Sequence, residues 1–319
     1  MAHELTTING KVSMAYIGQT PWHGLGQKLT EGATIETWQQ EAGMNFNVCR
    51  SPVQFGVGNE SQTWDNKHVL FRDDNKHPLG IVSNSYHIVQ PAQVLEFFRG
   101  LCEDNGFVLD TAGVLNGGAR YWALAQLPLG FAIGEDQVSG FALLATSCDM
   151  SIATIGQITS VRVVCANTLR ASLNAAKSAI KVPHSTKFDE AKVKVDMGLV
   201  EKSWQQFEQE VKTLANRKLS RFEAVNILID AMGDPNKPVA EQPNARPMAE
   251  IMRLFDGAAI GSELPSANGT AWGLINAATQ FYDHTSGRSV NTRLGSSWFG
   301  DAGHRKDDIY ARTLAMAND

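Results

Sequence analysis

The chain has 319 residues, of which 43% are hydrophobic and 19% are charged, and its formal net charge is −5. These values are typical of a globular protein that forms one large domain or two modest ones. An acidic total excludes a protein that coats nucleic acid through bulk positive charge, although it is compatible with a local basic groove.

Three further sequence features narrow the class of protein. The N-terminus lacks the basic start and apolar core of a signal peptide, and no apolar run reaches the roughly 20 residues that cross a bilayer. The four cysteines form no Cys-x-x-Cys pair and no Cys/His cluster, so neither a zinc site nor a disulfide framework is expected. We therefore expect a soluble cytoplasmic protein with reduced thiols and no membrane partner.

The first half of the sequence predicts strands separated by tight turns. Residues 68–82 contain two apolar runs around a polar turn, which is typical of a β-hairpin. Residues 85–107 change to a helical period that ends at Gly106. Further strands are predicted over 110–128, 137–148 and 152–166. We expect an antiparallel meander that runs into a helix beginning near Asn167.

The second half is predicted to be mostly helical. Helices are expected over 188–219, 220–233, 248–258, 269–285 and 309–317. Ser220 and Glu223 form the capping box typical of a helix start. Residues 181–187 have the composition of a linker, and loops are expected at 234–247, which is rich in proline, and at 286–308. We therefore predict an α+β protein with a β-rich core over 1–187, which contains a strand-to-helix junction, and a helical region over 188–319.

That junction is free of acidic residues over a long stretch. Between Asp149 and Asp189 there is no Asp or Glu. On a helix, Arg170, Lys177 and Lys181 would lie within about 20° of one another. Leucine and alanine residues would form an apolar stripe beside them, and small polar residues such as Asn174 would flank the basic side. Regularly spaced positive charges without bulky neighbours suit a phosphate backbone.

An ordinary structural explanation competes with this hypothesis. The basic stripe could be a solvated helix face whose acidic partners come from elsewhere in the fold. Arg162 stands between two valines on the preceding strand and points away from them. It is either a phosphate contact or a surface charge.

Two other segments combine aromatic and basic residues. Trp22 and His23 precede two glycines, so an indole could stack on a base, or it could anchor the N-terminal arm or a subunit interface. The 286–308 segment contains the candidates Arg293, Trp298, Phe299 and Arg305. Aromatic and basic groups in alternation are typical of single-strand binding, and a loop that packs two aromatics on the helices is the alternative.

Motifs for catalysis are missing from the sequence. Asp65 and Lys67 have the spacing of some metal-dependent nucleases but lack a second acid on a neighbouring strand. The histidines are scattered, and neither a Gly-x-Ser-x-Gly elbow nor a phosphate-binding P-loop occurs. We expect no catalytic residue, no metal and no cofactor, and hence a protein that is not an enzyme.

Four segments resemble a phage- and plasmid-borne family whose domain has no assigned function. They are 22–26 (WHGLG), 162–169 (RVVCANTL), 272–284 (WGLINAATQFYDH) and 298–300 (WFG). The segments are spread over nearly the whole chain. The resemblance supplies no activity.

The order of elements also resembles the core of phage single-strand annealing proteins of the RecT, Redβ and Erf kind. In those proteins, subunits line up as rings or helical filaments, and the DNA backbone lies in a positive groove without use of ATP. The resemblance implies that Arg162, Arg170, Lys177 and Lys181 contact the backbone. This chain departs from that pattern in its acidic total and in lacking a basic tail.

We therefore expect an ATP-independent protein that binds and anneals single-stranded DNA in phage or plasmid recombination. Its partners would be single-stranded DNA and further copies of itself, in a ring or filament in the host cytoplasm. Two alternatives stay open: a phage-encoded enzyme that processes a small molecule or nucleotide in a pocket between the halves, and a non-enzymatic host-defence antagonist.

Overall fold

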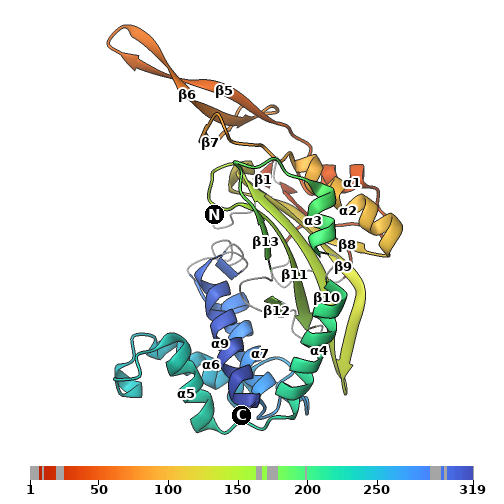
Figure 1. Ribbon diagram of the computed structural model, residues 1–319, viewed down its shortest axis with the longest axis vertical. Coiled ribbons are helices and arrows are strands. Elements are labelled where there is room, and N and C mark those ends of the chain that lie inside the picture. The colour runs from red at the N-terminus through yellow and green to blue at the C-terminus, as the bar shows by residue number, and fades with distance from the viewer. Residues whose placement is uncertain are drawn as a thin grey trace.

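The structure is a computed structural model that describes residues 7–8, 11–18, 25–162, 167–170, 179–197, 200–287, 296–297 and 300–318. Strands occupy the N-terminal half and helices occupy the C-terminal end (Figure 1). The predicted α+β class is therefore confirmed. In the described part of the chain, no helix is both long enough and apolar enough to span a membrane.

A large sheet forms the centre of the protein. Its strands are β3 Met14–Tyr16, β4 Gln27–Lys28, β8 Val108–Leu115, β9 Arg120–Ile133, β10 Asp136–Ser147, β11 Thr154–Arg162, β12 Asn167–Arg170 and β13 Ala179–Val182. The order is β12-β11-β10-β9-β8-β3-β4, with β13 also paired to β11. Strands β8 to β11 are consecutive and antiparallel, so the predicted meander is confirmed. A separate short ladder joins β1 Thr7–Ile8 to β2 Lys11–Val12.

The two faces of this sheet belong to different apolar clusters. One face presents small residues such as Ala123 and Ala142, and α1 Ile35–Glu41 and α2 Pro91–Asn105 pack on it through Trp38 and Phe97. The other face carries larger residues, among them Trp122, Leu124, Phe141 and Leu143. Helix α2 ends at Gly106 with φ 69°, as the sequence predicts, because glycine adopts this left-handed conformation without strain.

A three-stranded sheet of β5 Val48–Val57, β6 Glu60–Arg72 and β7 Pro78–Ser83 projects from the main body (Figure 1). Strands β6 and β7 form the hairpin predicted at 68–82. Strands β5 and β6 continue beyond β7 and are closed by a turn in which Gly58 has φ 63°. We call residues 53–67 the ribbon. It is not among the elements expected from the sequence.

Arg72 fastens the base of this projection to the main sheet. Its guanidinium is fully buried and donates two hydrogen bonds to the Asp74 carboxylate, at 2.9 and 2.6 Å. A third bond of 3.1 Å reaches the Gly117 carbonyl in the turn between β8 and β9, and the guanidinium stacks 3.9 Å from the centroid of the Phe46 ring. This planar fork therefore ties β6 to the main sheet.

The helical region contains α3 Glu190–Met197, α4 Val200–Asn216, α5 Arg221–Met232, α6 Ala245–Arg253, α7 Ala271–Gln280 and α9 Asp301–Asn318. Helix α5 begins with the predicted capping box: the Glu223 amide donates to Ser220 Oγ, and the Glu223 carboxylate accepts from the Ser220 amide at 2.7 Å. The expected loop at 286–308 is wrong over 301–308, where α9 has already begun. The reason is that Ala302, Ile309 and Tyr310 recur at helical spacing and are buried together.

The helical region packs on the far end of the sheet. In α4, Trp204 and Phe207 lie against Phe131 of β9, with ring centroids 5.6 and 5.8 Å away. The buried Asp136 carboxylate of β10 accepts hydrogen bonds from Trp272 Nε1 at 3.1 Å and from Ser266 Oγ at 2.9 Å. These contacts join the N-terminus of α7 to the sheet.

The Arg72 contacts predict that Arg72→Met lowers the free energy of unfolding by about 2–3 kcal/mol, since the Gly117 carbonyl loses its donor and Asp74 loses its partner. Chemical denaturation followed by far-ultraviolet circular dichroism measures this change. Lys76→Met removes a neighbouring exposed charge and should stay within about 0.5 kcal/mol of the native protein. Equal midpoints for both variants would contradict this role of Arg72.

A second prediction concerns Asp110 in the bulge of β8. Burial raises the pKa of its carboxyl from 3.8 to about 6. The native state therefore binds a proton more tightly than the unfolded state, and stability contributed by this group is lost as the pH rises from about 4 to about 6. Asp110→Asn should raise the free energy of unfolding by about 1–2 kcal/mol at neutral pH and leave it unchanged below about pH 4. Denaturant titrations across this pH range, with the exposed Asp230→Asn as control, check it.

Candidate nucleic-acid interface

The candidate interface lies at one edge of the main sheet, where β12 and β13 pair with β11. Strand β12 pairs antiparallel with residues 159–162 of β11, and β13 pairs antiparallel with residues 154–157. The two short strands therefore lie one after the other along the same side of β11, opposite β10. We call β11, β12 and β13 together the basic edge.

The prediction of a helix beginning near Asn167 is wrong in the described residues. Asn167–Arg170 and Ala179–Val182 are the strands β12 and β13. Residues 181 and 182, expected in a linker, also belong to the sheet. Strand β11 offers backbone groups that need partners, and β-branched residues such as Thr168, Ile180 and Val182 suit a sheet. Arg170 and Lys181 therefore do not share a helix face.

The ladder register fixes where the predicted basic residues stand. Arg162 lies at the end of β11 opposite Asn167, Arg170 lies opposite Thr159, and Lys181 lies opposite Ile155. Asn174, Lys177, Trp22, His23, Arg293, Trp298 and Phe299 lie outside the described residues. Of the four predicted backbone contacts, the structure thus brings three, Arg162, Arg170 and Lys181, to one edge of the sheet.

Lys181 is the residue of this set whose side chain the structure describes. It is exposed, whereas its neighbours Ile180 and Val182 pack against the core that holds the main sheet to α2. Because side chains alternate along a strand, this packing directs Lys181 to the opposite face, which it shares with its cross-strand partner Ile155. The ammonium group is therefore accessible to a ligand.

His184 holds the end of β13 in place. Its Nδ1 lies 3.2 Å from the His87 carbonyl oxygen and its Nε2 lies 3.1 Å from the Ile152 carbonyl oxygen. The imidazole also stacks on Tyr86, with ring centroids 4.4 Å apart, and the His87 amide donates to the His184 carbonyl at 2.6 Å. In the sequence, His184 is one of a scattered set of histidines without an expected role.

Arg305, a candidate for stacking or for a subunit interface, lies in a helix and not in the expected loop. It lies in α9, is half-buried and donates a 3.0 Å hydrogen bond to the Ala231 carbonyl at the end of α5. Its guanidinium thus helps to join two helices.

The next residue forms a buried network that the sequence analysis missed. Lys306 Nζ donates to Asp283 Oδ1 and to Ser297 Oγ, both at 2.7 Å, and Ser297 Oγ also donates to Asp283. All three side chains are buried. Lys306 stands four residues after Ala302 and three before Ile309, so helical periodicity would have placed it on the buried face if the helix had been extended to 301.

Ionisable groups with raised pKa belong mainly to the core. Burial raises the pKa of Cys148 to about 12, and it also raises the pKa of Tyr121 well above its ordinary value. The Tyr121 hydroxyl donates to the Val89 carbonyl and lies 3.3 Å from Cys148 Sγ. In the described residues, no group of three or more His, Cys, Asp or Glu side chains is placed to hold a metal ion.

The buried network makes a prediction for Lys306→Met. The Asp283 carboxylate would keep its charge in a buried position without the lysine, so the free energy of unfolding should fall by about 3–5 kcal/mol. The double variant Lys306→Met/Asp283→Leu should recover a large part of this loss, because no buried charge is left over. Thermal unfolding of both variants, with Lys237→Met at an exposed site as control, measures the difference. A double variant less stable than the single one would contradict this account.

Comparison with known proteins places the chain in a family. The model of the family described as a domain of unknown function (DUF932) matches residues 78–300. This range is more than two thirds of the chain and includes the basic edge and α7. No curated protein and no solved structure matches the chain. The match fits the expected membership of a family without an assigned function, and the protein belongs to the DUF932 family.

Proposed function

We propose that this protein binds single-stranded DNA along the basic edge and anneals it to a complementary strand without ATP. The observation that carries the proposal is the charge of that edge. No acidic residue occurs between Asp149 and Asp189, a stretch that contains β11, β12 and β13. An acidic protein would thus present one locally positive surface.

The spacing of the basic residues supports this proposal. Lys181 stands beside Ile155 and Arg170 beside Thr159, so their positions are roughly 13 Å apart along β11 and an even number of residues apart, on one face of the ladder. Arg162 is an odd number of residues from both Ile155 and Thr159 on β11, so its position is not part of this row. A row of charges along a straight strand would neutralise phosphates of an extended single strand at intervals. The bases would then point away from the protein and could pair with a complement.

The proposed mechanism is electrostatic. Lysine and arginine side chains would displace counterions from the backbone of one strand, and base stacking with the incoming strand would supply the free energy of annealing. Self-association into a ring or filament would extend the basic edge from subunit to subunit. The proposal includes a phage or plasmid origin and action in the cytoplasm of the host cell.

Fluorescence anisotropy of a labelled oligonucleotide tests DNA binding. Arg170→Glu/Lys181→Glu should weaken the affinity for a single strand at least about tenfold, because each substitution replaces attraction to phosphate by repulsion. The slope of log affinity against log salt should also become shallower by about 0.7 for each phosphate that the variant no longer neutralises. Lys237→Glu/Arg253→Glu reverses two exposed charges on the helical region and is the matched control.

The outcomes of this titration separate the functional classes. Tight single-strand binding that weakens with salt and with the edge variant supports the proposal and leads to an annealing assay without ATP. Absence of binding at low salt overturns it and turns attention to a small-molecule ligand or a protein partner. An equal decrease in affinity for the edge variant and the control would overturn the assignment to this edge.

A further inference from the structure

The imidazole ring of His184 lies between two backbone carbonyl groups. Its Nδ1 is 3.2 Å from the His87 oxygen, and its Nε2 is 3.1 Å from the Ile152 oxygen. A neutral imidazole carries one N–H and donates to only one of these oxygens, while its other nitrogen turns a lone pair toward the second oxygen. An imidazolium carries two N–H groups and donates to both. The two acceptors therefore favour the ring with two protons.

The same ring stacks on the face of Tyr86. The two ring centroids are 4.4 Å apart, and the ring planes are inclined by 18°. A positive charge over the face of a tyrosine ring is attracted to its π electrons. Tyr86 is itself fixed, because it is buried and its hydroxyl donates to the Ser147 carbonyl at 2.6 Å. The stack is thus an independent contact that becomes stronger when His184 is charged.

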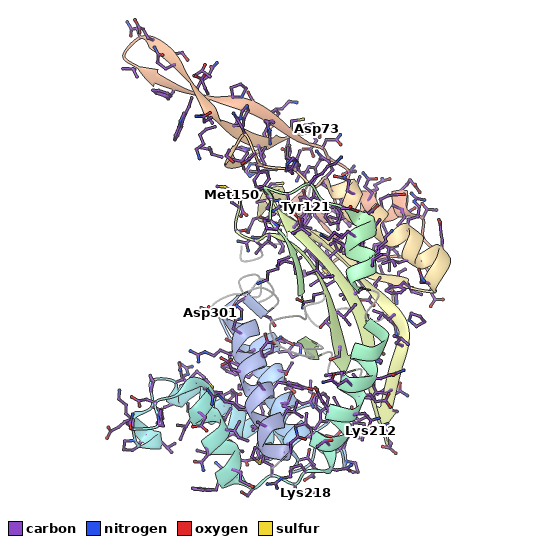
Figure 2. All side chains as sticks on the ribbon, in the orientation of Figure 1. Asp73, Tyr121, Met150, Lys212, Lys218 and Asp301 are labelled. Atoms are coloured by element: carbon purple, nitrogen blue, oxygen red, sulfur yellow. The ribbon has the colours of Figure 1, made fainter. Side chains whose placement is uncertain are left out.

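These contacts lie at the end of a short edge strand. Strand β13, Ala179–Val182, has four residues and ends two residues before His184. The ring reaches the Ile152 carbonyl in the turn between β10 and β11, and the His87 amide donates to the His184 carbonyl at 2.6 Å. Figure 2 shows Met150 of this turn at the end of the main sheet from which β5, β6 and β7 project. A four-residue edge strand gains little from its own ladder, so contacts beyond its end decide how firmly it is held.

Other ionisable groups stand on the elements around His184. Burial raises the pKa of Tyr86 above its ordinary value and that of Cys148 to about 12, so both side chains stay neutral near neutral pH. The Asp149 carboxylate lies 3.6 Å from Arg120 Nε. The charged residues of β13, of the segment after it and of α3, which packs on β13, are Lys181, Lys187, Asp189, Glu190, Lys192 and Lys194. By type, lysines and carboxylates keep their charge between about pH 6 and about pH 8.

Two histidines remain in this region, and their surroundings differ. His87 exposes its side chain, whereas His184 is half-buried between its two carbonyl acceptors and Tyr86. Histidine is the residue type whose charge ordinarily changes between about pH 5 and about pH 8. His87 therefore provides a matched internal reference for the titration of His184.

We propose that His184 is a proton-operated clasp on the basic edge. The imidazolium donates to both carbonyl groups and holds β13, with Lys181, against β11. When the second proton passes to solvent, one of the two hydrogen bonds is lost and the end of β13 loosens. The part that concerns DNA rests on the proposed function: the affinity for a single strand is higher in mildly acidic solution, because Lys181 is held in place and the imidazolium adds a positive charge beside it.

Nuclear magnetic resonance of the histidine side chains tests the clasp without DNA. The chemical shifts of the ring nitrogens distinguish imidazole from imidazolium, and His184→Gln identifies the signals of His184. As the pH rises from about 6 to about 8, His184 should keep its second proton to a higher pH than His87 does. A His184 ring with one proton at about pH 6, or one that loses its second proton together with His87, overturns the proposal.

Denaturant unfolding at the same pH values gives a second measurement. A proton that the folded clasp binds more tightly than the unfolded chain adds stability that is full below about pH 6 and is lost as the pH rises. The unfolding midpoint of the native protein should therefore fall between about pH 6 and about pH 8 more than that of His184→Gln. The contribution of Asp110 is common to both proteins and cancels in the difference. His87→Gln should follow the native protein, and an equal pH dependence of the native protein and His184→Gln overturns the clasp.

Anisotropy titrations at constant salt then test the effect on DNA. The native protein and His87→Gln should bind a single strand at least about threefold more tightly at about pH 6 than at about pH 8, whereas His184→Gln should lose most of this difference. An equal pH dependence in the native protein and His184→Gln overturns the regulation of DNA binding. Absence of binding at both pH values overturns the proposed function, while the resonance and unfolding measurements still decide the clasp.

Discussion

The paired strands β9 and β10 at the centre of the sheet determine where the other parts of the protein lie. Alternation along them puts Ala123, Ala125 and Ala142 on the face that packs against α1 and α2, and Trp122, Leu124, Phe141 and Leu143 on the other. Their ladder contains a bulge between Ser139 and Phe141. Gly140 lies in this bulge, where a Cβ atom would come within 3.2 Å of the Trp204 ring. The same two strands thus receive both the N-terminal helices and α4.

The sheet also gives the basic edge its geometry. On a helix, the charges of this segment would point in one direction from a single element. On β11, β12 and β13 they stand instead at fixed positions along a straight edge, set by the ladder register. A row of this kind suits an extended polymer with regular charge better than a compact anion. The strands therefore change the geometry of the proposed contact with DNA, which is still electrostatic.

Buried polar contacts fix the positions of three segments: the base of the ribbon, β13 and α9. Arg72 ties the base of the ribbon to the turn between β8 and β9, and His184 holds the end of β13 between two carbonyl groups. Lys306 joins α9 to the segment that contains Asp283. Burying a charge costs free energy unless its partners are in place, so each contact disfavours alternative packing. The ribbon and α5 lie at opposite ends of the body that these contacts hold together (Figure 1).

Local signals along the chain were enough to predict the meander, the β6–β7 hairpin, the end of α2 at Gly106 and the capping box of α5. They also revealed the segment without acids, since charge is a property of composition. That Asn167–Arg170 and Ala179–Val182 are strands depends instead on the free edge of β11, which supplies their hydrogen-bond partners. Packing between distant elements likewise buries Lys306 and leaves Trp64 exposed. Burial depends on which distant elements pack together, and residue type and local spacing do not specify that packing.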